Sequence, residues 1–192
     1  MIILVSKQVK GAFGVHFVAA ELYRSGFIAT PTTRSTEGID ILVSNTTGSK
    51  AVAIQVKTSS FTENGKPSFP IISYKESKDP KKAKMPLKER TEWIKRKINP
   101  SAQKFYILVY VPDEFFEKEM WDQVPDYYVV PSKEVLNGIL KIREEYLGVN
   151  KASQITRISE KTGSLVKDEG VWYWPPPEKY LRKIELLRRV LQ

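Results

Sequence analysis

Two short segments on either side of a turn, residues 38–44 and 50–58, constrain the fold more than any other part of the chain. Every second position of both segments carries a β-branched aliphatic side chain: Ile39, Ile41, Val43, Val52, Ile54 and Val56. Side chains of a strand alternate between the two faces of a sheet, so this spacing predicts two strands that bury one face. The residues between them, Asn-Thr-Thr-Gly-Ser, are typical of a turn. The sequence therefore predicts an antiparallel hairpin.

Burial also predicts the register of this hairpin. A turn centred between positions 47 and 48 places Asp40 opposite Gln55, and the aliphatic side chains then coincide on one face, as burial requires. Asp40, Gln55 and Lys57 meet on the other face, where packing alone needs no carboxylate, amide or ammonium group. Mg²⁺ prefers oxygen ligands and binds through few carboxylates together with phosphate. The pattern therefore favours phosphodiester chemistry, with Asp40 as the central metal ligand, the Gln55 side-chain oxygen and the Val56 carbonyl beside it, and Lys57 stabilising charge on the phosphate.

The remaining sequence predicts an α/β fold, with one mixed β-sheet flanked by helices in a single domain of residues 1–192. Helices are expected at about 9–25 and 87–98 and from about 132, and strands at 27–30, 105–111 and 127–130. Residues 59–86 contain four prolines and many charges, which predicts an irregular segment. The region at about 59–98 is thus expected to be a basic loop and helix. A basic helical tail is expected at about 171–192, with its helix at 178–191 and its aromatic run, residues 172–174, packed against the domain.

Composition excludes several classes of site. The chain has no cysteine and one histidine, His16, so a thiol nucleophile, a cysteine zinc site and a multi-histidine metal site are excluded within one chain. No segment approaches the roughly 20 apolar residues that cross a bilayer, and the apolar run at the N-terminus is too short for a signal sequence. We therefore expect a cytoplasmic protein without a membrane span.

Positive charge is concentrated in one region. The net charge is +9, and residues 75–104 hold eleven Lys or Arg against four Asp or Glu. Such a surplus attracts polyanions, most commonly nucleic acid, although a solvated lysine-rich loop has the same composition. The candidates for contacts with the phosphate backbone are Lys81, Lys82, Lys84, Arg90, Lys95, Arg96 and Lys97.

Gly38-Ile39-Asp40, followed by a polar hairpin and Ile54-Gln55-Val56-Lys57-Thr58, resembles the core motif of the PD-(D/E)XK nuclease superfamily, which includes many restriction enzymes and Holliday-junction resolvases. The motif covers about residues 11–60, and the order of elements extends the resemblance to about residue 145. It implies a restriction-endonuclease-like fold and a Mg²⁺ cofactor for which Mn²⁺ can substitute. Such enzymes often place a further acid on the preceding helix, which makes Glu21 a fourth catalytic and metal-ligating candidate.

Two positions depart from the superfamily pattern. Ile39 stands where the motif has proline, and Gln55 stands where the third motif position is usually acidic; some similar nucleases carry Gln-x-Lys there. An amide oxygen attracts a divalent cation less strongly than a carboxylate does. We therefore expect the free protein to bind metal weakly, with substrate phosphate supplying further oxygens.

The sequence thus predicts a metal-dependent endonuclease acting on nucleic acid, more plausibly DNA, and compatible with a homodimer. One alternative is a nuclease-like fold that binds nucleic acid without cutting it, alone or within a larger DNA-processing complex. Another is an interaction subunit whose basic region meets an acidic protein. Substitution of Lys57 separates the first two, because it removes cleavage from an enzyme and leaves a binding protein almost unchanged.

Overall fold

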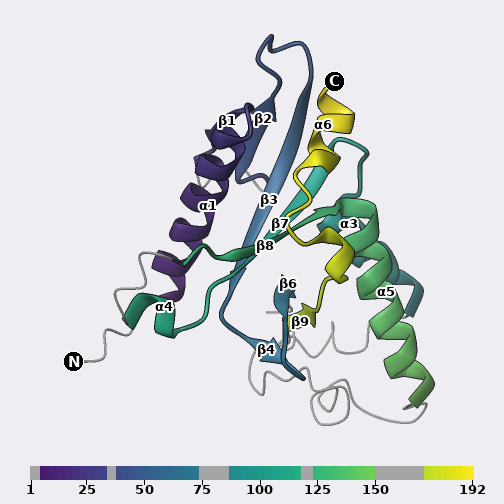
Figure 1. Ribbon diagram of the computed structural model, residues 1–192. Helices are drawn as coiled ribbons and strands as arrows, with labels where there is room; N and C mark the ends of the chain where they lie inside the picture. Colours follow the sequence, from purple (N-terminus) through teal and green to yellow (C-terminus); the bar gives the residue numbers. More distant parts are fainter. Residues whose placement is uncertain (1–4, 34–37, 74–86, 118–122, 150–170) are drawn as a thin grey trace.

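The computed structural model describes residues 5–33, 38–73, 87–117, 123–149 and 171–192 (Figure 1). In these ranges a five-stranded sheet has the order β1-β2-β3-β7-β8. Its strands are β1 (Ile28–Pro31), β2 (Ile41–Ser44), β3 (Ala51–Ser59), β7 (Lys104–Tyr110) and β8 (Asp126–Pro131). β3 and β7 are parallel, and the other neighbours are antiparallel. A mixed sheet with helices on both faces is the predicted α/β architecture.

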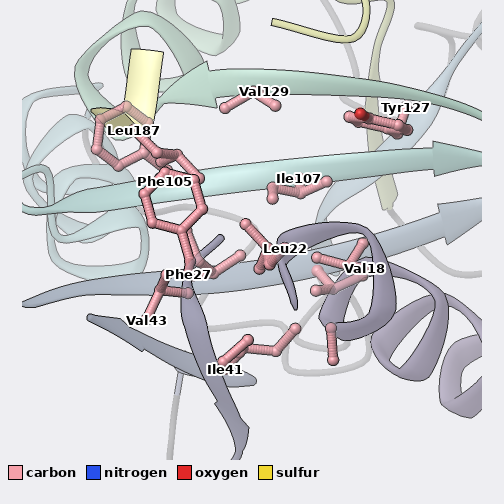
Figure 2. Close-up of a cluster of buried hydrophobic side chains, with 14 of the residues drawn as sticks. Val18, Leu22, Phe27, Ile41, Val43, Phe105, Ile107, Tyr127, Val129 and Leu187 are labelled. Carbon is pink, nitrogen blue, oxygen red and sulfur yellow. The ribbon is translucent and has the colours of Figure 1, made fainter. Parts of the chain in front are cut away.

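Helix α1 (Lys7–Arg24) covers one face of the sheet together with the C-terminal helix α6 (Glu185–Leu191). Ser6 caps α1, since its side chain accepts a hydrogen bond from the Val9 amide at 3.3 Å. Gly26 follows the helix with a φ of 86°, a conformation that favours glycine. Apolar side chains from both helices and from the strands form the first core cluster (Figure 2), which includes Val18, Leu22, Ile41, Val43, Ile54, Val56, Ile107, Val129 and Leu187.

The other face carries a second apolar cluster. It is covered by α3 (Leu87–Ile98) and α5 (Ser132–Val149), and by a two-stranded sheet of β6 (Phe69–Ser73) and β9 (Val171–Trp174). Its buried residues include Phe69, Ile94, Ile98, Leu108, Val130, Val135, Ile139 and Trp174. Of the aromatic run, Trp174 is buried as predicted, and the side chains of Trp172 and Tyr173 lie outside the described part of the structure. Among the described helices, none has the length and apolar character needed to cross a bilayer.

Two predicted segments differ from the structure. The described part of the 59–86 segment is not irregular throughout, because it contains β4 (Thr62–Glu63), β5 (Lys66–Pro67) and β6. The C-terminal helix is interrupted: η3 (Glu178–Tyr180) and α6 are separate elements. Arg182 causes this break, since its φ is 50° and its amide donates to the Tyr127 carbonyl at 2.8 Å. Backbone pairing with β8 therefore replaces helix continuation. A short helix, α4 (Glu114–Glu117), follows β7.

Candidate active site

The predicted register of the hairpin is confirmed. Ile41 pairs with Ile54 and Ser44 pairs with Ala51, so the strand register continues to Asp40 opposite Gln55. The Asp40 amide donates to the Ile54 carbonyl at 2.8 Å, and one carboxylate oxygen of Asp40 accepts the Val56 amide at 2.7 Å. In the second bond, the Asp40 side chain satisfies the backbone amide of Val56 in β3, just before β2 begins. Asp40 is therefore held against β3 from both its backbone and its side chain.

Gln55 and Lys57 point to the face of β3 opposite the α1 side, because their neighbours Ile54 and Val56 belong to the first core cluster. Parallel pairing with β7 sets Gln55 beside Tyr106, which belongs to the second cluster. These side chains border a cavity of about 210 Å³. The residues lining it come from β3, β7, β6, α3 and the start of the hairpin: Gly38, Gln55, Lys57, Ile71, Ile72, Lys97 and Tyr106.

The charge of Asp40 acts on two groups of this cavity. Burial lowers the pKa of the Lys57 ammonium, and the nearby Asp40 carboxylate offsets part of that change. Burial raises the pKa of the Tyr106 phenol well above its ordinary value, and Asp40 adds to the rise. Like any phenol of ordinary or raised pKa, Tyr106 is protonated at neutral pH and can donate a hydrogen bond. Asp40 is therefore close enough to Lys57 and to Tyr106 for its charge to act on both.

The oxygen atoms of Gln55 and Asp40 fit a weakly held divalent cation. The Gln55 side-chain oxygen is buried and has no hydrogen-bond partner, which leaves it available as a ligand. Asp40 supplies a carboxylate, although one of its oxygens already accepts the Val56 amide. No cluster of three acidic or histidine residues occurs in the described part of the chain. A cation here would rely on water and on substrate phosphate for most of its ligands, as Mg²⁺ commonly does.

Glu21 does not join the other three candidates. It lies on α1 near Phe17, Ile107 and Tyr127, on the sheet face opposite Gln55 and Lys57. Its carboxylate pairs with Arg24 at 2.7 Å and accepts the Tyr127 hydroxyl at 3.5 Å. This placement removes the reason for expecting Glu21 as a second metal ligand, because the sheet separates it from the cavity.

Substitution of Glu21 tests this placement. We expect Glu21→Gln to change any nuclease activity by less than about twofold. The variant loses the charge pair with the exposed Arg24 but keeps an oxygen for the Tyr127 hydroxyl, and both contacts lie on the sheet face away from the cavity. Initial cleavage rates of the two proteins, compared at equal concentration, measure the effect. A rate reduced a hundredfold or more, as expected for loss of a metal ligand, would show that Glu21 takes part in metal binding.

The basic candidates fall into three groups. Lys95, Arg96 and Lys97 form the exposed last turn of α3, and Lys97 borders the cavity. Lys95 pairs with Glu92 at 2.8 Å. Arg90 lies within α3, although the position of its side chain is not described. The remaining candidates, Lys81, Lys82 and Lys84, lie outside the described residues.

Two residues beside the cavity were not predicted. Tyr106 lies in a continuous apolar run, and only its parallel pairing with β3 brings it next to Gln55. Lys104 starts β7 and is buried, with 8% of its surface exposed. Its ammonium donates to the Ile98 carbonyl at 2.9 Å. A buried lysine gives no local signal in the sequence, whereas alternation along 104–110 could have identified Tyr106 as facing the same side as Gln55 once the pairing was known.

Burial of Lys57 has a consequence for stability. Because its pKa is lower in the folded protein than in the unfolded chain, the unfolded chain binds more protons between the two pKa values. Lys57 therefore opposes folding at neutral pH, and this penalty is lost as pH rises through that window towards 10.5. We expect Lys57→Met to raise the melting temperature at pH 7 by about 2–4 °C, corresponding to ~1 kcal/mol. Thermal unfolding followed by circular dichroism measures this; a lower melting temperature would show that Lys57 stabilises the fold.

Comparisons with protein-family models, with curated proteins and with solved structures found no match to this chain.

Proposed function

We propose that this protein is a metal-dependent endonuclease that hydrolyses phosphodiester bonds in DNA, with a PD-(D/E)XK-type site in which glutamine takes the place of the second acid. The observation that supports the proposal best is that Gln55 and Lys57 line one cavity and that the Gln55 side-chain oxygen there has no partner. Asp40 lies opposite Gln55 in the predicted register, close enough for its charge to act on Lys57. The basic last turn of α3 at the same cavity supports a nucleic-acid substrate.

Each residue has a role that follows from its chemistry. Asp40, the Gln55 oxygen and the Val56 carbonyl would hold the cation. A bound Mg²⁺ supplies Lewis-acid polarisation of the phosphate and a lowered pKa of its water. Lys57 stabilises negative charge that develops on the phosphate, and its partly buried position strengthens that interaction. The Tyr106 phenol donates to a phosphate oxygen, and Lys97 supplies a second cationic contact to the substrate phosphate.

The concentration of metal needed for cleavage tests the role of Gln55. We expect Gln55→Glu to lower the Mg²⁺ concentration for half-maximal DNA cleavage by about tenfold, because the variant restores the missing negative charge at nearly the same shape. Titrations of Mg²⁺ and Mn²⁺ with both proteins, with EDTA as the blank, measure the shift. If the variant needs as much metal as the wild type, Gln55 does not hold the cation.

A binding protein without catalysis is the second candidate, and one specific observation favours it. Asp40 is the single acid placed beside the cavity among the described residues, and one of its oxygens is already hydrogen-bonded. Such a site can retain affinity for nucleic acid while holding metal too weakly for catalysis. DNA binding by wild type, with no cleavage in Mg²⁺ or Mn²⁺ and none after Gln55→Glu, would establish this candidate.

A further inference from the structure

The cavity is electrostatically suited to an anion before any metal is considered. Two of the described residues that line it are lysines, Lys57 and Lys97, and none of them is acidic. Lys104, a third lysine, is buried nearby, and among the described residues Asp40 is the carboxylate whose charge acts on Lys57. Low-dielectric walls, including Ile71 and the other buried side chains, strengthen charge interactions inside the cavity. The local balance therefore favours a negatively charged ligand.

Lys104 offsets the partial negative charge at the end of α3, which would otherwise oppose anion binding. The last turn of α3 ends beside the cavity, and a helix C-terminus carries partial negative charge on its free carbonyl groups. The Lys104 ammonium donates to the Ile98 carbonyl at 2.9 Å, and Ile98 directly follows Lys97. This hydrogen bond satisfies the terminal carbonyl, offsets its partial charge and holds the turn that carries Lys97.

The backbone of Gly38 lies beside two of these groups. A Cβ atom at this position would lie 3.4 Å from the Lys104 ammonium and 4.0 Å from the Gln55 side-chain oxygen. The φ of Gly38 is 73°, a conformation that other residues rarely adopt. The cavity volume is about 210 Å³, which is enough for a tetrahedral oxyanion with some hydration.

Neutral donors complete the arrangement. The phenol of Tyr106 and the side-chain amide nitrogen of Gln55 are hydrogen-bond donors at the cavity. An oxyanion with three or four acceptor oxygens needs such donors in addition to charge. Donors from β3, β7 and α3 therefore surround one volume.

We propose that this cavity binds a single phosphate group without a metal, with Lys57 and Lys97 as cationic contacts and Lys104 as the positioning residue for Lys97. Phosphate then binds before the metal, and its oxygens complete the cation site at Asp40 and Gln55. This order rests on the proposed function, as does the identity of the ligand as a nucleic-acid phosphate. Binding of phosphate in the cavity does not rest on the proposed function, because it is measured in the absence of metal.

Inorganic phosphate is the first probe. The full chain is titrated in EDTA at pH 7 and constant ionic strength, and amide and side-chain NMR shifts are followed. We expect saturable shifts at Gly38 and the Gln55 side chain, about tenfold weaker binding by Lys97→Met, and a change below about twofold for Lys7→Met. Lys7 is an exposed lysine of α1, so its substitution is a control for net charge. Absence of saturable shifts, or equal weakening by both variants, would overturn the proposal.

The positioning role of Lys104 has its own readout. Lys104→Met is expected to shift the free-protein resonances of Lys97 and Ile98 and to weaken phosphate binding about tenfold, whereas Lys104→Arg restores binding to within about threefold. Phosphate affinity of Lys104→Met equal to wild type would contradict the role. If Lys104→Met does not fold, Lys104→Arg and the Lys97→Met titration decide the proposal.

Oligonucleotides separate the two sources of phosphate. Short single strands with and without a 5′-phosphate are titrated in EDTA against wild type and Lys97→Met. Tighter binding of the phosphorylated strand, lost in the variant, identifies a terminal phosphate as the ligand. Equal binding of both strands, weakened in the variant, identifies an internal phosphodiester. Binding unaffected by Lys97→Met overturns the pocket, and cleavage enters none of these results.

Discussion

Replacement of Asp40 by asparagine is expected to lower metal-dependent DNA cleavage by at least about a hundredfold while the fold is kept. The carboxylate is the one negative ligand proposed for the cation, and removal of its charge leaves two neutral oxygens. The asparagine oxygen can still accept the Val56 amide, which Asp40 accepts at 2.7 Å. Initial rates of plasmid nicking, measured beside thermal unfolding curves, give both quantities.

A matched control uses another aspartate of the same sheet. Asp126 begins β8 and pairs with Arg182 at 3.0 Å, with both side chains partly exposed. Asp126→Asn removes the same charge away from the cavity, so its cleavage rate should stay within about twofold of wild type. An Asp40→Asn protein that cuts as fast as Asp126→Asn would show that Asp40 binds no essential metal.

Introduction of a methyl group at Gly138 is expected to have the largest effect on stability. A Cβ atom there would lie 2.3 Å from Nε1 and 2.4 Å from Cε2 of the buried Trp174 ring. The ring cannot remain in place, so Gly138→Ala must move β9 away from α5 or distort the helix. We expect a loss of about 3 kcal/mol, at the upper end for overpacked cores, and a melting temperature lower by about 6–12 °C.

Gly11 provides the control for this substitution. It lies within α1, and an added Cβ would meet nothing within 4 Å. Gly11→Ala should therefore stabilise the protein by about 0.5–1 kcal/mol, because alanine loses less backbone entropy in a helix. Denaturant unfolding of both variants measures the difference. A Gly138→Ala protein as stable as wild type would mean that Trp174 does not pack against α5 as described.

Local pattern was sufficient for the hairpin and for three of its polar residues. The β-branched alternation of 38–44 and 50–58 determines which faces are buried, and the turn between them leaves one register that buries both aliphatic sets. Asp40, Gln55 and Lys57 could therefore be assigned to one face from sequence alone. The bounds of α3 could also be predicted, because Asn99-Pro100 favours a helix end. The helix does end before Asn99, whose φ is 47°.

Pairing between distant strands could not be predicted from local sequence pattern. β6 pairs with β9, about 100 residues further along the chain, and Pro67 and Pro70 weakened any local signal for strands. Ile71 and Ile72 of β6 nevertheless form one wall of the cavity. The cavity thus depends on a contact that no pattern within residues 59–86 indicates.

The prediction that Glu21 joins the site was wrong for a related reason. Helical periodicity places Glu21 at the edge of the apolar stripe of α1, but it does not say which face of the sheet the helix covers. The helix covers the face that bears Ile54 and Val56, because both surfaces are apolar. Any residue of α1 that reaches this sheet meets the aliphatic face, and Gln55 and Lys57 lie on the other.

Nicking of supercoiled DNA by the purified protein tests the central claim most directly. Wild type and Lys57→Met are incubated with DNA in Mg²⁺, in Mn²⁺ and in EDTA, and DNA binding is measured in parallel. We expect nicking by wild type only when metal is present. At protein concentrations that saturate the DNA, we expect nicking by Lys57→Met to be reduced at least about a hundredfold. Binding by both proteins without nicking in either metal, or equal nicking by both, would contradict a nuclease site at Asp40, Gln55 and Lys57.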